Sequence, residues 1–354
     1  MNKLSAYISG KVFAAFFIVL FLILSLDVLS ALIDQLGDLR NDYTLRQAFI
    51  YIGLTIPGRV NEFIPLATLI GCLVAMGMLS SSSEIMIMRA SGVSLFQLMR
   101  LVFKPILWLI ILSIVIAEFI SPFTDQWATS HKDLQLSGRD QSLVLQSGLW
   151  HREADNFMHF NVVQPGGVLY GVTLLKFDRS GKLTQTLIAD RASFQSNNWL
   201  LENVKITSFG DDKIIQDQFT TQLWETQLTP KMLSYLSLDA SELSPTGLFE
   251  YIAFLEQQGL DTKAYELAFW QKCLHPLAIM SLVLVALSFI FGPLRSSTMG
   301  YRIFIGVVVG ISFQFTQNLL GPSSLIYGIS PFYAVLSPII IISALGLILL
   351  YRVR

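Results

Sequence analysis

Polar side chains inside long apolar segments are the first candidates for chemistry in this sequence. A charge at the centre of a membrane span costs about 2.5–3.5 kcal/mol on insertion scales, so such a residue usually faces protein or water. Asp27 lies in the first apolar segment. Arg59 and Glu62 lie three residues apart in the second, where they share a helix face and can pair. The fifth segment carries three more polar residues on one helix face, Gln314, Gln317 and Asn318.

The sequence supports two interpretations of these residues equally. Either they form local pairs that tighten helix packing, or they line a cavity toward the outer leaflet, where the head group of an amphiphile would lie. Lys272 and His275 are likewise three residues apart in the fourth segment. For Lys272, packing or snorkelling to the membrane interface is favoured.

The sequence contains none of the catalytic or cofactor motifs that we sought. G-x-x-x-x-G-K-[ST], H-E-x-x-H, G-x-S-x-G and C-x-x-C are all absent. Cys72 and Cys273 lie in apolar segments, and the four histidines show no ligand spacing. We therefore predict a chain that is not an enzyme and binds no metal or cofactor, so that ATP hydrolysis would need a partner.

The segments that position these residues are membrane spans. The chain is 53% hydrophobic and 14% charged, with a net charge of −1, whereas soluble domains carry about 25% charged residues. A span needs about 20 apolar residues. Six segments qualify: Val12–Ile33, about Phe49–Leu79, Leu101–Ile120, Leu267–Phe291, Ile303–Leu320 and about Phe332–Leu350.

Lysine and arginine in the short loops set the orientation. Both termini and the stretch Gly77–Gly92 are on the basic side and are predicted to be cytoplasmic. We therefore expect three domains: residues 1–120 with three spans, a periplasmic domain over residues 121–262, and residues 263–354 with three more spans.

The cytoplasmic stretch predicts a short helix over residues 82–92. Ser82 or Ser83 can cap its start, Glu84 suits the helix dipole, and Ser91-Gly92 can end it. The helix has an apolar surface that includes Met86. It either rests on the bilayer or docks to a soluble partner, and the stretch alone favours neither.

The outer domain reads as all-β, because turn signals separate several strand-length runs. A sandwich or jelly roll is expected. In one run, Val168, Tyr170, Val172 and Leu174 alternate with residues that are also mostly apolar. One face would pack and the other would line an apolar groove, although a plain sandwich core is favoured without further information. A helix capped by Ser244 and closed by Gly259 is expected to end the domain.

Local motifs resemble those of the LptF/LptG permeases of the lipopolysaccharide export transporter, and most of all its LptG subunit. The most specific is the run LSFIFGPLR, Leu287–Arg295. Shorter matches are Asp34-Gln35-Leu36, Gly77-Met78-Leu79, Ser83-Glu84, Ala90-Ser91-Gly92, Gly321-Pro322 and Tyr327-Gly328. The resemblance covers nearly the whole chain. It implies a polytopic α-helical membrane protein with six transmembrane helices and an inserted periplasmic β-jelly roll.

The resemblance also implies partners and a substrate. The chain would pair with an LptF-type subunit, two copies of the LptB ATPase, which bind ATP and Mg²⁺, and an LptC-type protein. Lipopolysaccharide would leave the outer leaflet of the inner membrane through gates between span one of one subunit and span five of the other. It would then pass along the jelly rolls. A permease for another lipid or lipoprotein, or a membrane scaffold without transport, remains the alternative.

The matched positions assign candidate residues. Asp34 matches an acidic position after span one, Lys132 a basic one after span three, and Arg59 lies beside a position that can be basic. In a departure from the family, Ala31, Gly37 and Asp38 occupy positions that can be basic, with Arg40 nearby. The ATPase contact is assigned to Ser83, Glu84, Met86, Arg89, Ser91 and Gly92. The cavity and gate are assigned to Asp27, Asp34, Arg40, Arg59, Glu62, Lys132, Gln314, Gln317 and Asn318, and the jelly-roll lipid path to Val168, Tyr170, Val172 and Leu174.

Overall fold

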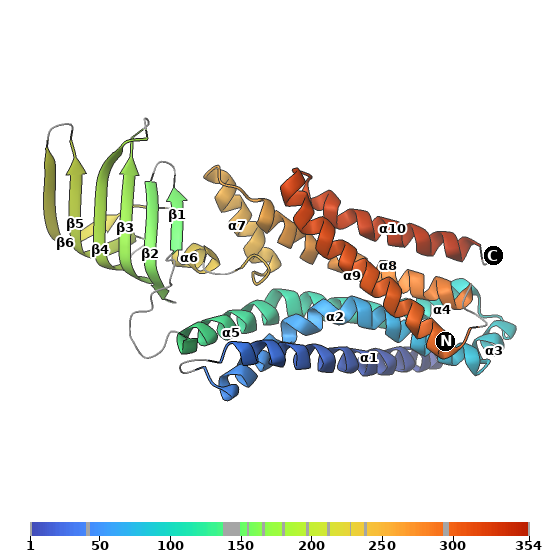
Figure 1. The fold of residues 1–354 in the computed structure, drawn as a ribbon. Coiled ribbons are helices and arrows are strands. Elements are labelled where there is room, and N and C mark those ends of the chain that lie inside the picture. The colour runs from blue at the N-terminus through green and yellow to red at the C-terminus, as the bar shows by residue number, and fades with distance from the viewer. Residues whose placement is uncertain are drawn as a thin grey trace.

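The computed structural model is elongated, with a helical bundle at one end and a β sheet at the other (Figure 1). Both termini and the short helix α3 (Glu84–Ala90) lie at the end remote from the sheet. The structure describes residues 2–39, 43–136, 149–153, 156–164, 167–178, 181–195, 198–210, 213–226, 228–236, 239–292 and 297–352.

Six helices in the described part of the chain are long and apolar enough to cross a membrane, as predicted. Two of them form the centre of the bundle: the most apolar windows of α2 (Leu45–Ser81) and α8 (Lys263–Phe291) are 72% and 67% buried, against 17% for α9 (Met299–Tyr327). The other three spans begin in α1 (Asn2–Gly37), α4 (Leu95–Val115) and α10 (Pro331–Tyr351).

The third span runs well past Ile120, where the sequence analysis ended it. A π-helical turn, η1 (Ile116–Ile120), joins α4 without a break to α5 (Ser121–Leu136). The composition of α5 is polar, which is why it was assigned to the outer domain. α5 packs against α2, and Ser121 Oγ donates to Asp125 Oδ2 at 2.6 Å within the helix. The chain therefore leaves the bundle as a helix.

The described strands form one antiparallel six-stranded sheet in which each strand pairs with its neighbours in sequence. The sheet lies between α5 and α8 in the chain, which confirms the inserted β domain. Over these residues the domain is a single continuous sheet. Its strands are β1 (Leu149–Glu153), β2 (Asn156–Gln164), β3 (Val168–Phe177), β4 (Leu183–Gln195), β5 (Asn198–Phe209) and β6 (Ile214–Trp224).

A row of residues across the sheet interrupts the alternation that the sequence predicted. Gly171 in β3 and Asn203 in β5 have φ values of 62° and 55°, in the left-handed region. The paired residues of each ladder skip this row while keeping the same register on both sides. Buried positions that flank the row are three residues apart instead of two, as in Leu169 and Val172. The strands therefore turn over at this row.

The buried face of the sheet is covered by helices that follow it in the chain. These are α6 (Pro230–Leu236) and α7 (Pro245–Gln257), which share one apolar cluster with the strands. Trp199 is fully buried there and its Nε1 donates to the carbonyl oxygen of Leu228 at 2.7 Å. Ser244 caps α7 by accepting from Gly247 N at 3.0 Å, and Gly259 follows the helix at a φ of 65°, both as predicted.

Candidate functional site

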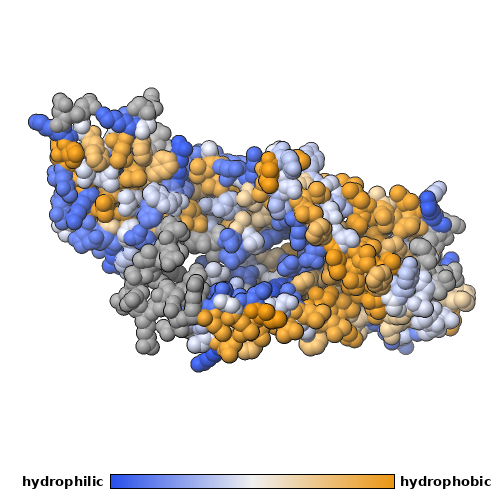
Figure 2. All heavy atoms as spheres, viewed as in Figure 1, coloured by the Kyte–Doolittle hydropathy of each residue, from blue (hydrophilic) through white to orange (hydrophobic). Residues whose placement is uncertain are grey.

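A cavity of about 530 Å³ lies inside the helical bundle, toward the sheet. On the face in Figure 2, hydrophilic residues gather around a hollow between the apolar band of the bundle and the β sheet. α2 and α8 line the cavity together with η1, α5, α9 and α10. Five of the nine residues that the sequence assigned to the cavity and gate are among the lining residues: Arg59, Glu62, Gln314, Gln317 and Asn318.

Arg59 pairs across helices and not, as predicted, with Glu62 on its own helix. Its Nη1 lies 2.6 Å from Asp27 Oδ2 of α1, and its Nε donates to Thr55 Oγ1 at 3.2 Å. The spacing along α2 allowed an Arg59–Glu62 pair, but only the packing of α1 against α2 could reveal the carboxylate opposite. The charge of Arg59 is therefore already balanced at the edge of the cavity.

Glu62 instead connects α2 to α9. Gln314 Nε2 donates to Glu62 Oε1 at 3.3 Å, so the predicted polar face of α9 does turn toward α2. Gln317 Nε2 donates to the carbonyl oxygen of Val335 in α10 at 3.3 Å. Amide groups thus both line the cavity and hold its walls together.

A buried polar group joins three helices on the cavity wall. Ser113 Oγ of α4 donates to Asn61 Oδ1 of α2 at 2.6 Å and lies 3.1 Å from His275 Nδ1 of α8. The sequence offered only the polarity of His275 as a signal, because its partners are far away in the chain. The group fixes the positions of α2, α4 and α8.

The outer part of the cavity contains acidic residues around Lys272, for which the sequence favoured packing or snorkelling to the membrane interface. Lys272 Nζ donates to the carbonyl oxygen of Leu243 at 2.5 Å and interacts electrostatically with Asp125, Glu118 and Glu242. The Asp125 carboxylate lies against Gly58, where a Cβ would be 3.0 Å from Oδ2. These carboxylates escaped detection because they were assigned to the outer domain or to an apolar helix.

Glu242 lies in the segment before α7 and outside the membrane spans. Burial raises the pKa of its carboxyl, and the nearby Asp239 and Asp125 add to the rise. The hydrogen bond that Thr129 Oγ1 donates to Glu242 Oε1 at 3.1 Å lowers the pKa, as does a backbone hydrogen bond with Asp239. The mouth of the cavity therefore favours a neutral carboxyl more than an exposed site would.

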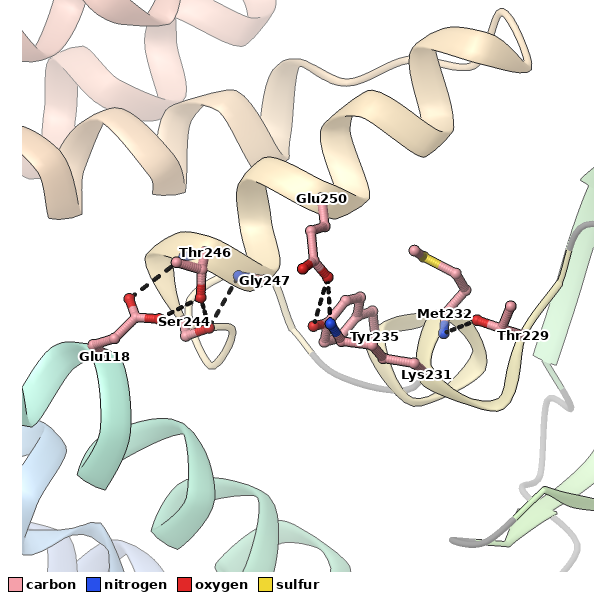
Figure 3. A network of polar contacts seen from close by, with 9 residues as sticks. All are labelled: Glu118, Thr229, Lys231, Met232, Tyr235, Ser244, Thr246, Gly247 and Glu250. Atoms are coloured by element: carbon pink, nitrogen blue, oxygen red, sulfur yellow. Dashed lines mark hydrogen bonds and ion pairs between the residues drawn. The ribbon is translucent and has the colours of Figure 1, made fainter.

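α7 bridges the cavity mouth and the β domain (Figure 3). At its first turn, the Glu118 carboxylate from η1 accepts hydrogen bonds from Thr246 Oγ1 and Thr246 N. Further along, Glu250 Oε2 lies 2.5 Å from Lys231 Nζ of α6. The hydrogen bond with Glu250 raises the pKa of Lys231. Polar contacts thus run from the membrane bundle through α7 to α6.

Two residues assigned to the gate, Lys132 and Asp34, are not among the residues that line the cavity. Lys132 on α5 pairs with Asp38 Oδ2 at 2.8 Å and lies over the rings of Tyr43 and Tyr51. Asp34 is exposed near the end of α1, and Arg40 lies outside the described residues. Lys132 therefore binds Asp38 just after α1, and Asp38 occupies one of the positions that can be basic in the family.

The predicted helix between spans two and three is α3, and its surface is mostly exposed. Its preceding residue Ser83 has a φ of 62° and makes no side-chain cap. Ser82 Oγ donates to Glu84 Oε1 at 3.0 Å, and the Tyr7 hydroxyl of α1 also bonds to Glu84. Ile85 is buried in the bundle. Of the residues assigned to the ATPase contact, Ser83, Met86, Arg89, Ser91 and Gly92 are exposed and Glu84 is half-buried.

The four residues assigned to a lipid path in β3 do not share one face. Val172 and Leu174 are buried in the apolar cluster, whereas Tyr170 is 38% exposed and Val168 is half-buried. The cause is Gly171, whose left-handed backbone reverses the alternation. Only Val172 and Leu174 face the core that α6 and α7 cover.

Comparison with known proteins gives consistent matches over nearly the whole chain. Residues 6–352 match the family of lipopolysaccharide export system permeases LptF/LptG. Lipopolysaccharide export system permease protein LptG of Haemophilus influenzae is 35% identical over 341 residues, covering 96% of this chain and 95% of that protein. The LptG protein of Escherichia coli K12 is 33% identical over 339 residues, covering 95% and 94%.

Proposed function

Because the chain belongs to the LptF/LptG family of lipopolysaccharide export permeases, we propose that it is the permease subunit that extracts lipopolysaccharide from the outer leaflet of the inner membrane. The observation that carries this proposal is a cavity with both polar and apolar walls, within a bundle of apolar membrane helices and open toward the β domain. Such a cavity suits an amphiphile with a large hydrophilic head group.

The chemistry of the cavity fits the sugar part of that head group. Amide side chains such as Gln317 and Asn318 offer both donors and acceptors, which match the hydroxyl groups of a saccharide. Its two cations, Arg59 and Lys272, already have acidic neighbours. We therefore propose that this subunit holds the saccharide, while an LptF-type partner supplies most of the charge that meets the phosphates.

The acyl chains impose the largest cost on export. Each buried CH₂ is worth about 0.8 kcal/mol, so several chains exposed to water would cost many tens of kcal/mol. An apolar relay is needed, and the apolar cluster of the β domain, including Val172 and Leu174, is the candidate in this chain. α6 and α7 cover that cluster, so the chains would reach it only when these helices move aside.

Partner subunits are supported by the unequal burial of the spans. Within this chain the most apolar windows of α1 and α9 are only 22% and 17% buried, so their free faces are available to an LptF-type subunit and an LptC-type protein. α3 is proposed to dock to one of two LptB ATPase copies, which bind ATP and Mg²⁺. The chain is a multi-pass protein of the bacterial inner membrane. We place its termini in the cytoplasm and its β domain in the periplasm.

The proposed cycle starts at the cytoplasmic end. Closure of the ATPases on ATP would push α3, and α2 and α4 would carry the displacement to the cavity. α1 and α9 would then shift at their interfaces with the partner and narrow the cavity. The lipid would move toward the β domain and onward to the outer membrane.

Lipid composition in a reconstituted complex tests the proposal. The full chain would be purified with its host's partner subunits, placed in nanodiscs of phospholipid and lipopolysaccharide, and analysed by mass spectrometry before and after ATP addition. We expect bound lipopolysaccharide that ATP releases to an acceptor. Enrichment of another lipid or a lipoprotein would indicate a different permease. No enriched lipid and no ATP-dependent release would indicate a scaffold.

A further inference from the structure

A straight row of four residues on α9 faces α2 from one end of the bundle to the cavity. Its members are four positions apart, which keeps them on one side of a helix. The row extends over about 18 Å of the helix axis at 1.5 Å per residue. Its residues are Arg302, Gly306, Gly310 and Gln314.

The end of the row nearest α3 is a buried arginine. Arg302 is only 3% exposed, and its Nη1 donates to the carbonyl oxygen of Gly77 at 3.0 Å. Gly77 lies in the last turns of α2, where the helix dipole favours a positive charge. A Cβ on Gly77 would lie 3.1 Å from Arg302 Nη1 and 3.2 Å from Met299 Sδ. Only glycine gives the guanidinium this room.

The middle of the row is a close contact between α9 and side chains of α2. A Cβ on Gly306 would lie 2.3 Å from Leu73 Cδ1, and one on Gly310 would lie 2.2 Å from Leu66 Cδ1. Small residues let membrane helices approach closely and interlock. α9 therefore cannot slide along α2 without lifting off these leucines.

The far end of the row enters the cavity. Gln314 donates to Glu62, and both residues line the cavity wall. α9 is otherwise the least buried of the spans in the described structure. Its position along α2 is thus fixed at one end by Arg302, near the helix that is proposed to meet the ATPase, and at the other by Gln314.

We propose that Arg302 is a positioning residue that, by holding α9 in register on α2 through Gly77, makes the displacement of α3 reach the lipid cavity. The inference rests on the proposed function, because it assigns Arg302 a role in coupling ATP hydrolysis to lipid export. Arg302 touches no lipid. It acts through the row that ends at Glu62 and Gln314.

The test compares the amount of lipopolysaccharide released per ATP hydrolysed by reconstituted full complexes. Arg302→Met removes the donor, and Gly77→Ala keeps the arginine but displaces it. Both are expected to lower the ratio by about tenfold, as for a lost hydrogen bond to a charged group. Arg302→Lys keeps one donor and is expected to restore most of the ratio. Arg352→Met, an equal loss of charge at the exposed end of α10, is the control and is expected to match the wild type.

Assembly and melting temperature of each complex separate coupling from folding. If Arg302→Met and Gly77→Ala assemble and keep the wild-type ratio, the inference is overturned. If Arg302→Met does not accumulate, the other two variants test the inference. A lowered ratio in Gly77→Ala with most of the ratio kept in Arg302→Lys supports it, and a wild-type ratio in Gly77→Ala overturns it. A wild-type complex that hydrolyses ATP but releases no lipopolysaccharide would count against the proposed function itself, whatever the variants do.

Discussion

The membrane cavity and the β-domain core contrast in what fills them. The cavity is lined by amides, hydroxyls and paired charges set among apolar side chains such as Phe313 and Val335, and it remains open. The β-domain core is apolar, built around Trp199, Phe160 and Trp224, and is closed by α6 and α7. The difference suggests a division of labour. The cavity is ready to receive a polar head group, while the β domain must first expose its apolar face.

α7 lies between these two regions and contacts both. Its first turn is bonded to Glu118 of η1, and Glu250 on the same helix is bonded to Lys231 of α6. A π-helical turn such as η1 often marks a functional site in a helix. A shift of α4 would therefore displace α7 and α6, the helices that cover the β-domain core.

The largest effect is expected for Gly171→Ala, which should disrupt the β domain and leave the cavity intact. The residue has a φ of 62°, and its Cβ would lie 2.2 Å from Asn161 Nδ2. Backbone strain and steric overlap together should lower the free energy of unfolding of the β domain by about 3 kcal/mol. Proteolysis of the full chain in increasing urea would measure it. Gly181→Ala is the control, because Gly181 has a φ of 80° but no atom near its Cβ. Equal losses at the two sites would show that the contact with Asn161 is unimportant.

A smaller effect, on the cavity side, is expected for Arg59→Glu. The variant places a carboxylate beside Asp27 and Glu62. It should destabilise the helical bundle by about 2 kcal/mol, because the partly buried Asp27 loses its cationic partner. Lipid release should fall while urea resistance of the β domain stays unchanged. The exchange Asp27→Arg with Arg59→Asp should recover release if pairing is what matters. Normal release by Arg59→Glu alone would show that lipid export does not need the Asp27–Arg59 ion pair.

The smallest effect expected is a pH dependence of β-domain stability. His151 in β1 is buried against Phe254, its Nε2 has no hydrogen-bond partner among the described residues, and burial lowers its pKa despite the opposing charge of Glu153. The unfolded chain then binds a proton that the folded chain does not. Stability should be full above about pH 6.5 and should fall as the pH drops toward the folded pKa. His151→Phe should flatten that part of the urea midpoint profile, and an unchanged slope would point to other groups.

Much of the architecture was predictable because membrane spans are read directly from long apolar segments. All six spans were found in this way, whereas turn signals indicated the inserted β domain and capping residues indicated the short helix between the second and third spans. The prediction of a polar face on α9 was also correct. The strand reversal at Gly171 was missed, because glycine fits a regular alternation as well as a turned-over strand.

The site residues that escaped prediction depend on contacts between distant segments. Asp27 meets Arg59 only because α1 packs on α2, and Ser113 meets His275 only because α4 packs on α8. Asp125 was placed outside the membrane because α5 is polar in composition. Sequence spacing finds partners on one helix, so it favoured an Arg59–Glu62 pair over the observed one.

Photo-crosslinking at one phenylalanine tests the central claim most directly. Phe313 is 7% exposed and lines the cavity, whereas Phe96 is 75% exposed at the start of α4, near α3. Each would be replaced by benzoylphenylalanine in the full complex and irradiated in membranes that contain lipopolysaccharide. The account predicts a lipopolysaccharide adduct at position 313 that decreases when ATP is added, and none at position 96. Equal labelling at both positions, or none at 313, would contradict it.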